Sequence, residues 1–348
     1  MMTSLQRIAA ALACREPDRV PFFLLPILHG ARELGLTIRE YFSRPRHVVE
    51  GQLRLRRKYG HDCLTAFTYA ALEVEAWGGE VIFRDDGPPN AGAPIIRSAD
   101  AIGQLVPPEV GRTDCLLQGL ETLRMLKEAA GDEVPVIGSV IAPFSLPVMQ
   151  LGFEAYLDLI YDRPDAFARL MALNEEFCVA WANAQLAAGA SSITYVDPVG
   201  SPTIVPRELY LRTGLPIAQR TLARIRGTTA ISFASGRCLG IIDDVATTGA
   251  AAVSVSTDEE LGAVKRACRG RLAVVGNLNG IAMRSWSEAD AGRAVKRAIA
   301  SAGPGGGFIL SDNHGEIPWQ VPESVLLSIS HAVHTWGNYP LTWTQTDE

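Results

Sequence analysis

Short apolar runs that end abruptly in small and polar residues recur along most of the chain. The clearest of these runs are 134–141, 192–196, 229–233, 251–256, 272–275 and 308–310. Near-continuous apolar runs are typical of parallel strands that are buried on both faces of a sheet. Helical stretches separate several of them, as at 259–269 and 288–302. The alternation predicts a parallel βα array.

Two earlier segments, 62–67 and 80–83, also have strand character. With them the chain offers roughly eight strands, the number that closes a (β/α)8 TIM barrel. We therefore predict an α/β fold of this type. An open, doubly wound sheet is the competing architecture, but no Gly-x-Gly-x-x-Gly motif opens any of the predicted helices.

Residues 1–60 predict extra helices around one short strand. Pro21 and Pro26 restrict any strand at 20–28 to a few residues or to an edge. No linker rich in Pro, Gly or Ser divides the chain further along. We expect a single barrel domain over residues 1–348, with 1–60 as its N-terminal helical extension.

Composition and charge narrow the class of protein. Hydrophobic residues make up 47% of the 348, which is ample for a full-sized core. The net charge is −6 and no Lys/Arg block is present, which argues against a nucleic-acid partner. No apolar run is long enough for a membrane span, and no secretory pattern opens the chain. The six cysteines are far apart, without a Cys-x-x-Cys pair. We expect a cytoplasmic enzyme, with helix faces near its amino end available for a homodimer.

The polar residues after the predicted strands form one candidate site, because the carboxyl ends of barrel strands face one cavity. These tips supply Glu73, Glu75, Tyr195, Asp197, Ser235, Asn277, Asp312, Asn313 and His314. The set contains carboxylates, one imidazole and no lysine, a combination that suits acid–base catalysis or metal ligation. On a strand, Glu73 and Glu75 would face the same side.

His314 and Asp197 are the candidate catalytic residues. His314 lies in the polar burst directly after the apolar run 308–310. It is either a proton donor or acceptor for the reaction, or a structural histidine that ties down a loop. Asp197 precedes Pro198, and its alternative role is to cap a turn. Asn277 either contacts the substrate or only satisfies neighbouring backbone groups.

Several short motifs, taken in order and with their spacing, resemble the uroporphyrinogen decarboxylase superfamily. They are Arg19-Val20-Pro21, Tyr59-Gly60-His61-Asp62, Glu75-Ala76-Trp77-Gly78, Asp86-Gly87-Pro88-Pro89, Ala142-Pro143-Phe144, Asp197-Pro198, Gly276-Asn277-Leu278, and His314-Gly315 with Pro318 and Pro322. The resemblance is greater to the methyltransferase branch, which includes the methylcobamide:coenzyme M methyltransferases and related corrinoid-dependent demethylation enzymes. Members of the superfamily have a (β/α)8 barrel, in agreement with the pattern of strands.

The chain departs from the methyltransferases at their zinc ligands. Those enzymes carry a His-x-Cys-Gly motif and a late Cys, which together hold zinc. The matching positions here are Phe233, Ser235 and His314. Neither a phenyl ring nor a neutral hydroxyl replaces the lost ligands at Zn²⁺, and Cys238 lies three residues beyond Ser235. We expect no inherited zinc site and treat Phe233 and Ser235 as substrate-binding candidates.

The chain departs from the decarboxylases as well. Their Arg-x-x-x-Arg element corresponds to Leu28-His29-Gly30-Ala31-Arg32, their central aspartate to Tyr69, and their site tyrosine to a position near Met149. The many carboxylates of a porphyrinogen need several cations at the cavity, and the candidate site has too few. Decarboxylation of uroporphyrinogen is therefore not expected.

The resemblance implies an enzyme that moves a methyl group between a small substrate, such as a methyl ether, and a cobamide. The cobamide would be free or bound to a corrinoid protein. His314 would orient or protonate the departing heteroatom, with Asp197 or a glutamate setting its tautomer. Two other hypotheses stay open: a decarboxylase or lyase of a smaller acid that uses His314, and a non-catalytic ligand-binding relative. The alternative to a metal-free site combines His314 and Asp197 with Glu73 or Glu75.

Overall fold

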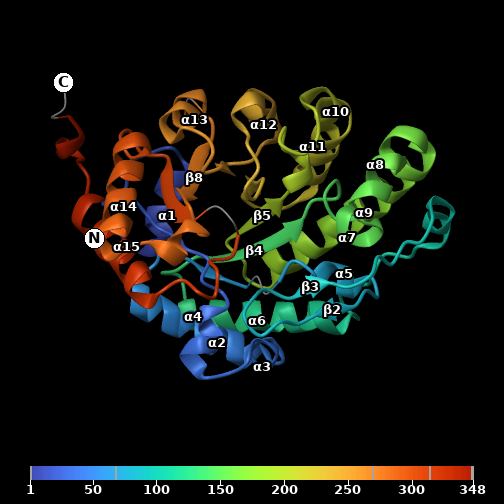
Figure 1. Ribbon diagram of the computed structural model, residues 1–348, viewed down its shortest axis with the longest axis horizontal. Coiled ribbons are helices and arrows are strands. Elements are labelled where there is room, and N and C mark those ends of the chain that lie inside the picture. The colour runs from blue at the N-terminus through green and yellow to red at the C-terminus, as the bar shows by residue number, and fades with distance from the viewer. Residues whose placement is uncertain (1, 67–68, 269, 313–314, 346–348) are drawn as a thin grey trace.

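A parallel sheet of seven strands forms the centre of the molecule. The computed structural model describes residues 2–66, 69–268, 270–312 and 315–345. In Figure 1 the strands curl around a centre and the helices surround them as a ring. In the order in which they pair, the strands are β1 (Leu64–Thr65), β4 (Val136–Ile141), β5 (Ser192–Val196), β6 (Thr229–Ser232), β7 (Ala252–Ser254), β8 (Ala273–Leu278) and β9 (Phe308–Asp312).

An extended segment near the amino end lies between the two edge strands of this sheet. Phe22 forms a parallel bridge with Leu310 of β9, and the Phe23 N–H donates to the Leu310 carbonyl at 2.9 Å. On its other side, the Phe22 carbonyl accepts a hydrogen bond of 2.8 Å from the N–H of Asp62, two residues before β1. The segment thus takes the remaining place in the barrel, and the predicted TIM-barrel-like α/β fold is confirmed.

Helices cover the outside of the strands and add layers at both ends of the barrel. The first four precede β1 in the chain, as the sequence predicts: α1 (Ser4–Leu12), α2 (His29–Leu34), α3 (Ile38–Phe42) and α4 (Pro45–Tyr59). The others are α5 (Leu72–Ala76), α6 (Asp114–Ala130), α7 (Pro147–Leu151), α8 (Phe153–Asp162), α9 (Pro164–Ala187), α10 (Arg207–Arg212), α11 (Gly214–Arg224), α12 (Ile242–Val245), α13 (Leu261–Cys268), α14 (Glu288–Ala302) and α15 (Glu323–Trp336). Among the described residues, no helix has the length and apolar character needed to cross a bilayer.

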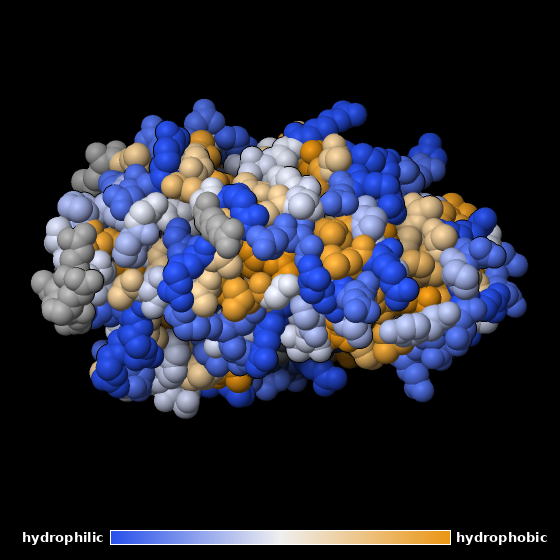
Figure 2. Space-filling view, turned by 90° about the horizontal axis from the view of Figure 1, so that it is seen from above, coloured by the Kyte–Doolittle hydropathy of each residue, from blue (hydrophilic) through white to orange (hydrophobic). Residues whose placement is uncertain are grey.

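A small antiparallel hairpin, β2 (Val81–Ile82) with β3 (Asn90–Ala91), follows α5. It lies in the lower part of Figure 1, as do α2 and α3. Figure 2 views the molecule from above, from the side on which α10, α12 and α13 lie in Figure 1, and shows polar and apolar side chains interspersed over that face. The hairpin belongs to the long connection between β1 and β4, so this connection adds a small second sheet beside the strand ends.

One end of the barrel is closed by α1 and a buried ion-pair network. Ile8 of α1 packs with Ile137 and Ile309 in an apolar cluster. Beside it, the fully buried Asp62 carboxylate accepts hydrogen bonds from Arg7 at 2.7 Å and from Arg19 at 2.8 Å. Breaking such a buried pair leaves an uncompensated charge, which is strongly destabilising. Two of the motifs that carry the family resemblance, Arg19-Val20-Pro21 and Tyr59-Gly60-His61-Asp62, therefore have a structural role.

The two faces of the strands have different surroundings. Ile137, Val275 and Ile309 share the α1 cluster, so their side of the strands faces the barrel interior. Tyr195 and Phe233 belong instead to the main core, which also contains residues from the surrounding helices. In β8, Val275 and Asn277 are partly exposed whereas Val274, Gly276 and Leu278 are buried, so Asn277 lies on the same side as Val275. This alternation decides which predicted site residues can reach the barrel interior.

Candidate functional site

A hollow of about 560 Å³ lies where β6, β7 and β8 end. Its lining comes from the loops after these strands and from the segment before α15. The lining residues are Ser235, Thr257, Asp258, Asn279, Ile281, Ala282, Arg284, Ser285 and Gln320. This volume is in the range of small-molecule sites, and the carboxyl ends of barrel strands are where such enzymes bind substrates. We refer to it as the mouth pocket.

The mouth pocket contains one cationic and one anionic side chain, Arg284 and Asp258. Arg284 donates its Nε–H to the carbonyl of Ile281 at 3.1 Å. Neither charged group forms an ion pair with the other or with another described residue. Both are therefore available to a ligand.

Ser256 connects the tips of β6, β7 and β8. Its hydroxyl donates to the Ser235 carbonyl at 2.9 Å, and its own carbonyl accepts from the Asn277 side-chain amide at 2.9 Å. Ser235 itself is exposed in the mouth pocket. Of the predicted site residues that the structure describes, Ser235 lines this pocket, whereas Asn277 braces its wall.

Asp197 lies at the end of β5 and is almost completely buried. Its Oδ1 accepts a hydrogen bond of 2.5 Å from the Ser145 hydroxyl, which in turn accepts from the Val199 N–H at 3.1 Å. Burial raises the pKa of Asp197 to about 6. Gly200 allows this packing, because a Cβ there would lie 2.6 Å from Asp197 Oδ2. The aspartate thus joins the loop after β4 to the loop after β5.

Tyr195 and Phe233 lie in the layer between the strands and the outer helices. Both side chains are fully buried in the main core. The Phe233 ring packs edge-to-face against Tyr210 of α10, with 6.4 Å between ring centroids. Their positions do not bring them to the mouth pocket, so a ligand there would not touch them directly.

Glu73 and Glu75 lie on helix α5 and not on a strand, so the side chains do not share one face. Glu75 is partly exposed and accepts a hydrogen bond of 2.8 Å from the Tyr69 hydroxyl. Glu73 is buried, and its Oε1 accepts from the Ile141 N–H of β4 at 2.8 Å. Burial raises the pKa of Glu73 to about 8, so this carboxyl holds a proton at neutral pH.

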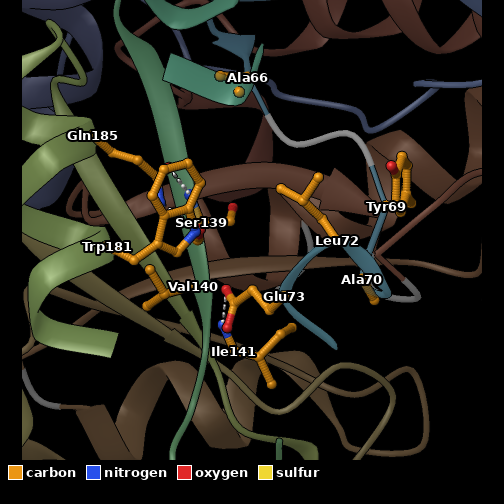
Figure 3. A pocket seen from close by; sticks show the side chains of 11 residues that line it. Ala66, Tyr69, Ala70, Leu72, Glu73, Ser139, Val140, Ile141, Trp181 and Gln185 are labelled. Carbon is orange, nitrogen blue, oxygen red and sulfur yellow. Dashed lines mark hydrogen bonds between the residues drawn. The ribbon is translucent and has the colours of Figure 1, made fainter. Parts of the chain in front are cut away.

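The position of Glu73 follows from the shortness of β1. Strand β1 pairs with β4 only as far as Thr65 and Ile137, so the edge of β4 beyond that point needs other partners. Gln185 of α9 supplies both a donor and an acceptor to the backbone of Ser139, at 2.9 and 3.0 Å. Figure 3 shows Glu73 and Gln185 at either end of this edge, around a small cavity of about 20 Å³. The cavity is large enough for one water molecule.

The carboxyl end of β9 carries the remaining predicted residues. Asp312 is buried and accepts a hydrogen bond of 2.9 Å from the Leu25 N–H, which ties β9 to the amino-terminal segment. Asn313 and His314 lie outside the described residues. The catalytic role expected for His314 therefore stays a prediction.

The residues present do not fit the zinc site of the related methyltransferases. Phe233 is packed in the core, and Ser235 offers a neutral hydroxyl. Cys238 is fully buried, and its Sγ lies 3.6 Å from Glu259. Burial, together with that carboxylate, raises the pKa of the Cys238 thiol well above its usual value. Among the described residues, no group of three or more His, Cys, Asp or Glu is placed to hold a metal ion.

Several residues of the site and its surroundings were not predicted from the sequence. Arg284 follows β8 by several residues, and Gln185 lies within the long helix α9, so neither stands out by its spacing. Asp258 lies two residues after a predicted strand, and from this position it could have been predicted as a site residue. Ser145 comes directly after the Ala142-Pro143-Phe144 motif, which also could have indicated it.

Comparison with known proteins places this architecture in a family. The family model "Uroporphyrinogen decarboxylase (URO-D)" matches residues 3–336. The chain belongs to the uroporphyrinogen decarboxylase family. Uroporphyrinogen decarboxylase from Burkholderia pseudomallei (strain 1106a) is 26% identical over 337 residues, which cover 89% of this chain and 90% of that protein. Methylcobamide:CoM methyltransferase MtaA from Methanosarcina barkeri is also 26% identical, over 281 residues that cover 78% of this chain and 81% of that protein.

Among solved structures, a methyltransferase from Methanosarcina mazei has the same fold, with a TM-score of 0.84 and 21% identity. The match covers 96% of this chain and 99% of that one. A B12-independent methionine synthase from Shewanella sp. W3-18-1 is more distant, with a TM-score of 0.54 and 12% identity over 83% of this chain and 85% of that one. The superfamily resemblance is confirmed, and the methyltransferase relatives support its methyltransferase branch. The relatives of the chain in this family are enzymes, both decarboxylases and methyltransferases.

Proposed function

We propose that the protein moves a methyl group between a small substrate, such as a methyl ether, and a cobamide. The observation that carries this proposal is the charge of the mouth pocket, where Arg284 is balanced by Asp258. A pocket with one cation does not match a porphyrinogen that presents many carboxylates. Its volume of about 560 Å³ suits a small ligand. The similarity to MtaA, a methylcobamide:CoM methyltransferase, supplies the reaction class.

In this proposal the side chains of the chain bind and orient the substrate and move one proton. His314 protonates the departing heteroatom, because the R–O fragment of a methyl ether leaves far more readily as an alcohol than as an alkoxide. Asp197 is the second catalytic candidate and would set the tautomer of His314. Substrate-binding roles are proposed for Glu73, Glu75, Ser235, Asn277, Asp312 and Asn313. Of these, Ser235 has the strongest support, since it lines the mouth pocket. Any influence of Tyr195 and Phe233 on the substrate would be indirect, because both are buried in the main core.

The cobamide is a second substrate in this account, either free or carried by a corrinoid protein that docks over the mouth pocket. It accepts or supplies the methyl group. No step is assigned to zinc, because Phe233 and Ser235 offer it neither an imidazole nor a thiolate. A thiol acceptor would then be poorly activated, and for that reason ethers and similar substrates fit better than thiols.

The experiment that tests the proposal is a difference spectrum of cobalamin with the purified protein. Mixing with Co(I) cobalamin and a methyl ether is expected to convert the spectrum to that of methylcobalamin, and His314→Ala is expected to abolish the conversion. Absence of conversion with every ether tested, with free cobalamin and with corrinoid protein alike, would contradict the proposal. Stoichiometric zinc in the purified protein would contradict the metal-free site.

A decarboxylase or lyase of a smaller acid is the second candidate. It is favoured by the similarity to the decarboxylase from Burkholderia pseudomallei, which is as high as that to MtaA. It also agrees with Arg284, which could hold a single carboxylate. Release of CO₂ without methylation of cobalamin would identify this activity. A third hypothesis, a non-catalytic ligand-binding relative, requires that His314→Ala leave every cellular phenotype intact.

A further inference from the structure

The mouth pocket carries two opposite charges that do not neutralise each other. Arg284 and Asp258 both line it, and the two side chains form no ion pair within 4.0 Å. They come from different loops, after β8 and after β7 respectively. A ligand with a single charge would gain from one of these side chains and lose to the other, whereas a ligand with both charges would gain from each.

The Arg284 side chain is held in place through Nε, which leaves its two terminal nitrogens for a ligand. Its Nε–H donates to the Ile281 carbonyl at 3.1 Å, within the turn that follows β8. None of the described residues accepts a hydrogen bond from its two terminal nitrogens. A guanidinium held at its base in this way presents a planar pair of donors, the geometry that a carboxylate accepts in a bidentate manner.

Part of the pocket lining is apolar. Ile281 is 49% exposed even though it is a large hydrophobic residue, and Ala282 lies beside it in the same lining. Both residues are in the loop that also supplies Arg284. The pocket therefore combines a carboxylate site, an apolar contact and an acidic group, with the neutral Ser235 and Thr257 nearby.

We infer that the preferred ligand of the mouth pocket is a small zwitterion, with a carboxylate on Arg284 and an ammonium group facing Asp258. Ile281 would offer an apolar contact to the carbon atoms of such a ligand. The inference rests on the proposed function in one respect: it narrows the substrate of that methyl transfer to a small amino-acid-like zwitterion that carries the methyl ether. The charge complementarity itself is a property of the pocket and can be tested without a cobamide.

Calorimetric titration of the purified full-length protein with matched probes tests the inference. Two zwitterions of different length, trimethylglycine and γ-trimethylammoniobutyrate, are each compared with the carbon isostere in which a tert-butyl group replaces the trimethylammonium group. Choline serves as a probe with the cation alone. At least one zwitterion is expected to bind about two- to fivefold more tightly than its isostere and than choline, since each side chain contributes one favourable charge contact.

Single substitutions should separate the two contacts. Arg284→Gln is expected to weaken binding of the zwitterion about two- to fivefold. Asp258→Asn should weaken the zwitterion and tighten the carbon isostere, because the repulsion of its carboxylate is removed. Both side chains are exposed, so folding should be unaffected, and circular dichroism verifies this. Arg237→Gln is the matched control, since Arg237 is exposed on the loop after β6 but does not line the pocket.

The inference is overturned if neither zwitterion binds saturably, if the isosteres bind as tightly as the zwitterions, or if Arg284→Gln and Asp258→Asn bind like the wild type. These results leave the proposed methyl transfer open to other substrates. Conversely, a zwitterion with a methyl ether that binds as expected but never methylates cobalamin would support the ligand class and count against the proposed function. The two failures are therefore distinguishable.

Discussion

The buried carboxyl of Glu73 makes the stability of the protein depend on pH in a definite direction. Burial raises its pKa from the ordinary 4.5 to about 8 in the folded state. Between these values the folded protein keeps a proton on Glu73, whereas the unfolded chain has lost it. Since the unfolded state then binds fewer protons, the contribution of Glu73 to stability is complete below pH 4.5 and is lost as the pH rises through 8.

The size of the effect follows from the same two values. One pKa unit corresponds to about 1.4 kcal/mol, so ionising Glu73 costs the folded state about 4–5 kcal/mol across the whole window. Glu73→Gln cannot ionise, and it keeps an oxygen for the hydrogen bond from the Ile141 N–H. We expect the variant to be about as stable as the wild type at pH 5 and about 4 kcal/mol more stable at pH 8.

Urea unfolding of both proteins at pH 5 and pH 8, followed by tryptophan fluorescence, measures this difference. Other titrating groups are the same in both proteins and cancel. Gln185→Ala is the control, because it removes the other side chain that covers the edge of β4 and should cost the same at both pH values. If the Glu73→Gln and wild-type stabilities run parallel with pH, Glu73 is ionised in the folded state and the reasoning is refuted.

Three further substitutions or modifications test the structural assignments. Asp62→Ala should lower the free energy of unfolding by about 3–5 kcal/mol, measured with urea, because it leaves Arg7 and Arg19 buried without their carboxylate; a loss below 1 kcal/mol would contradict the buried network. Ser145→Ala should cost about 1–3 kcal/mol and raise the pKa of Asp197 further, because it removes the donor to that buried carboxyl; an unchanged pH dependence of unfolding would speak against this contact. Cys238 should resist alkylation by iodoacetamide in the native protein and react only after unfolding, as peptide mass spectrometry can show. Rapid labelling of the native protein would mean that Cys238 is accessible and again a candidate metal ligand.

Much of the fold follows from local sequence signals. The run 192–196 forms β5 over the same residues, because its β-branched and aromatic residues suit a strand with one face fully buried and the other partly buried. Helix α14 begins where predicted, since Ser287 and Asp290 form a capping box. The barrel also predicted which ends of the strands would gather, and the mouth pocket lies there. Periodicity and capping are local, and so they can be read without the tertiary structure.

The candidate site was harder to predict, because it depends on where the chain leaves the barrel. Glu73 and Glu75 look like a strand by alternation, but β1 stops at Thr65 and the next described residues turn into α5. Tyr195 is on a predicted strand tip, yet only the three-dimensional packing shows that its side chain faces the helices. Arg284 lies in a loop whose path no periodicity specifies. Loop positions therefore need the structure.

Transfer of an isotopically labelled methyl group to cobalamin tests the central claim most directly. The protein is incubated with Co(I) cobalamin and a substrate whose methyl group carries deuterium, and the cobalamin is analysed by mass spectrometry. The account predicts deuterated methylcobalamin with the wild-type protein, and none with His314→Ala. Unlabelled cobalamin in every reaction, together with release of CO₂ from an acid substrate, would contradict it.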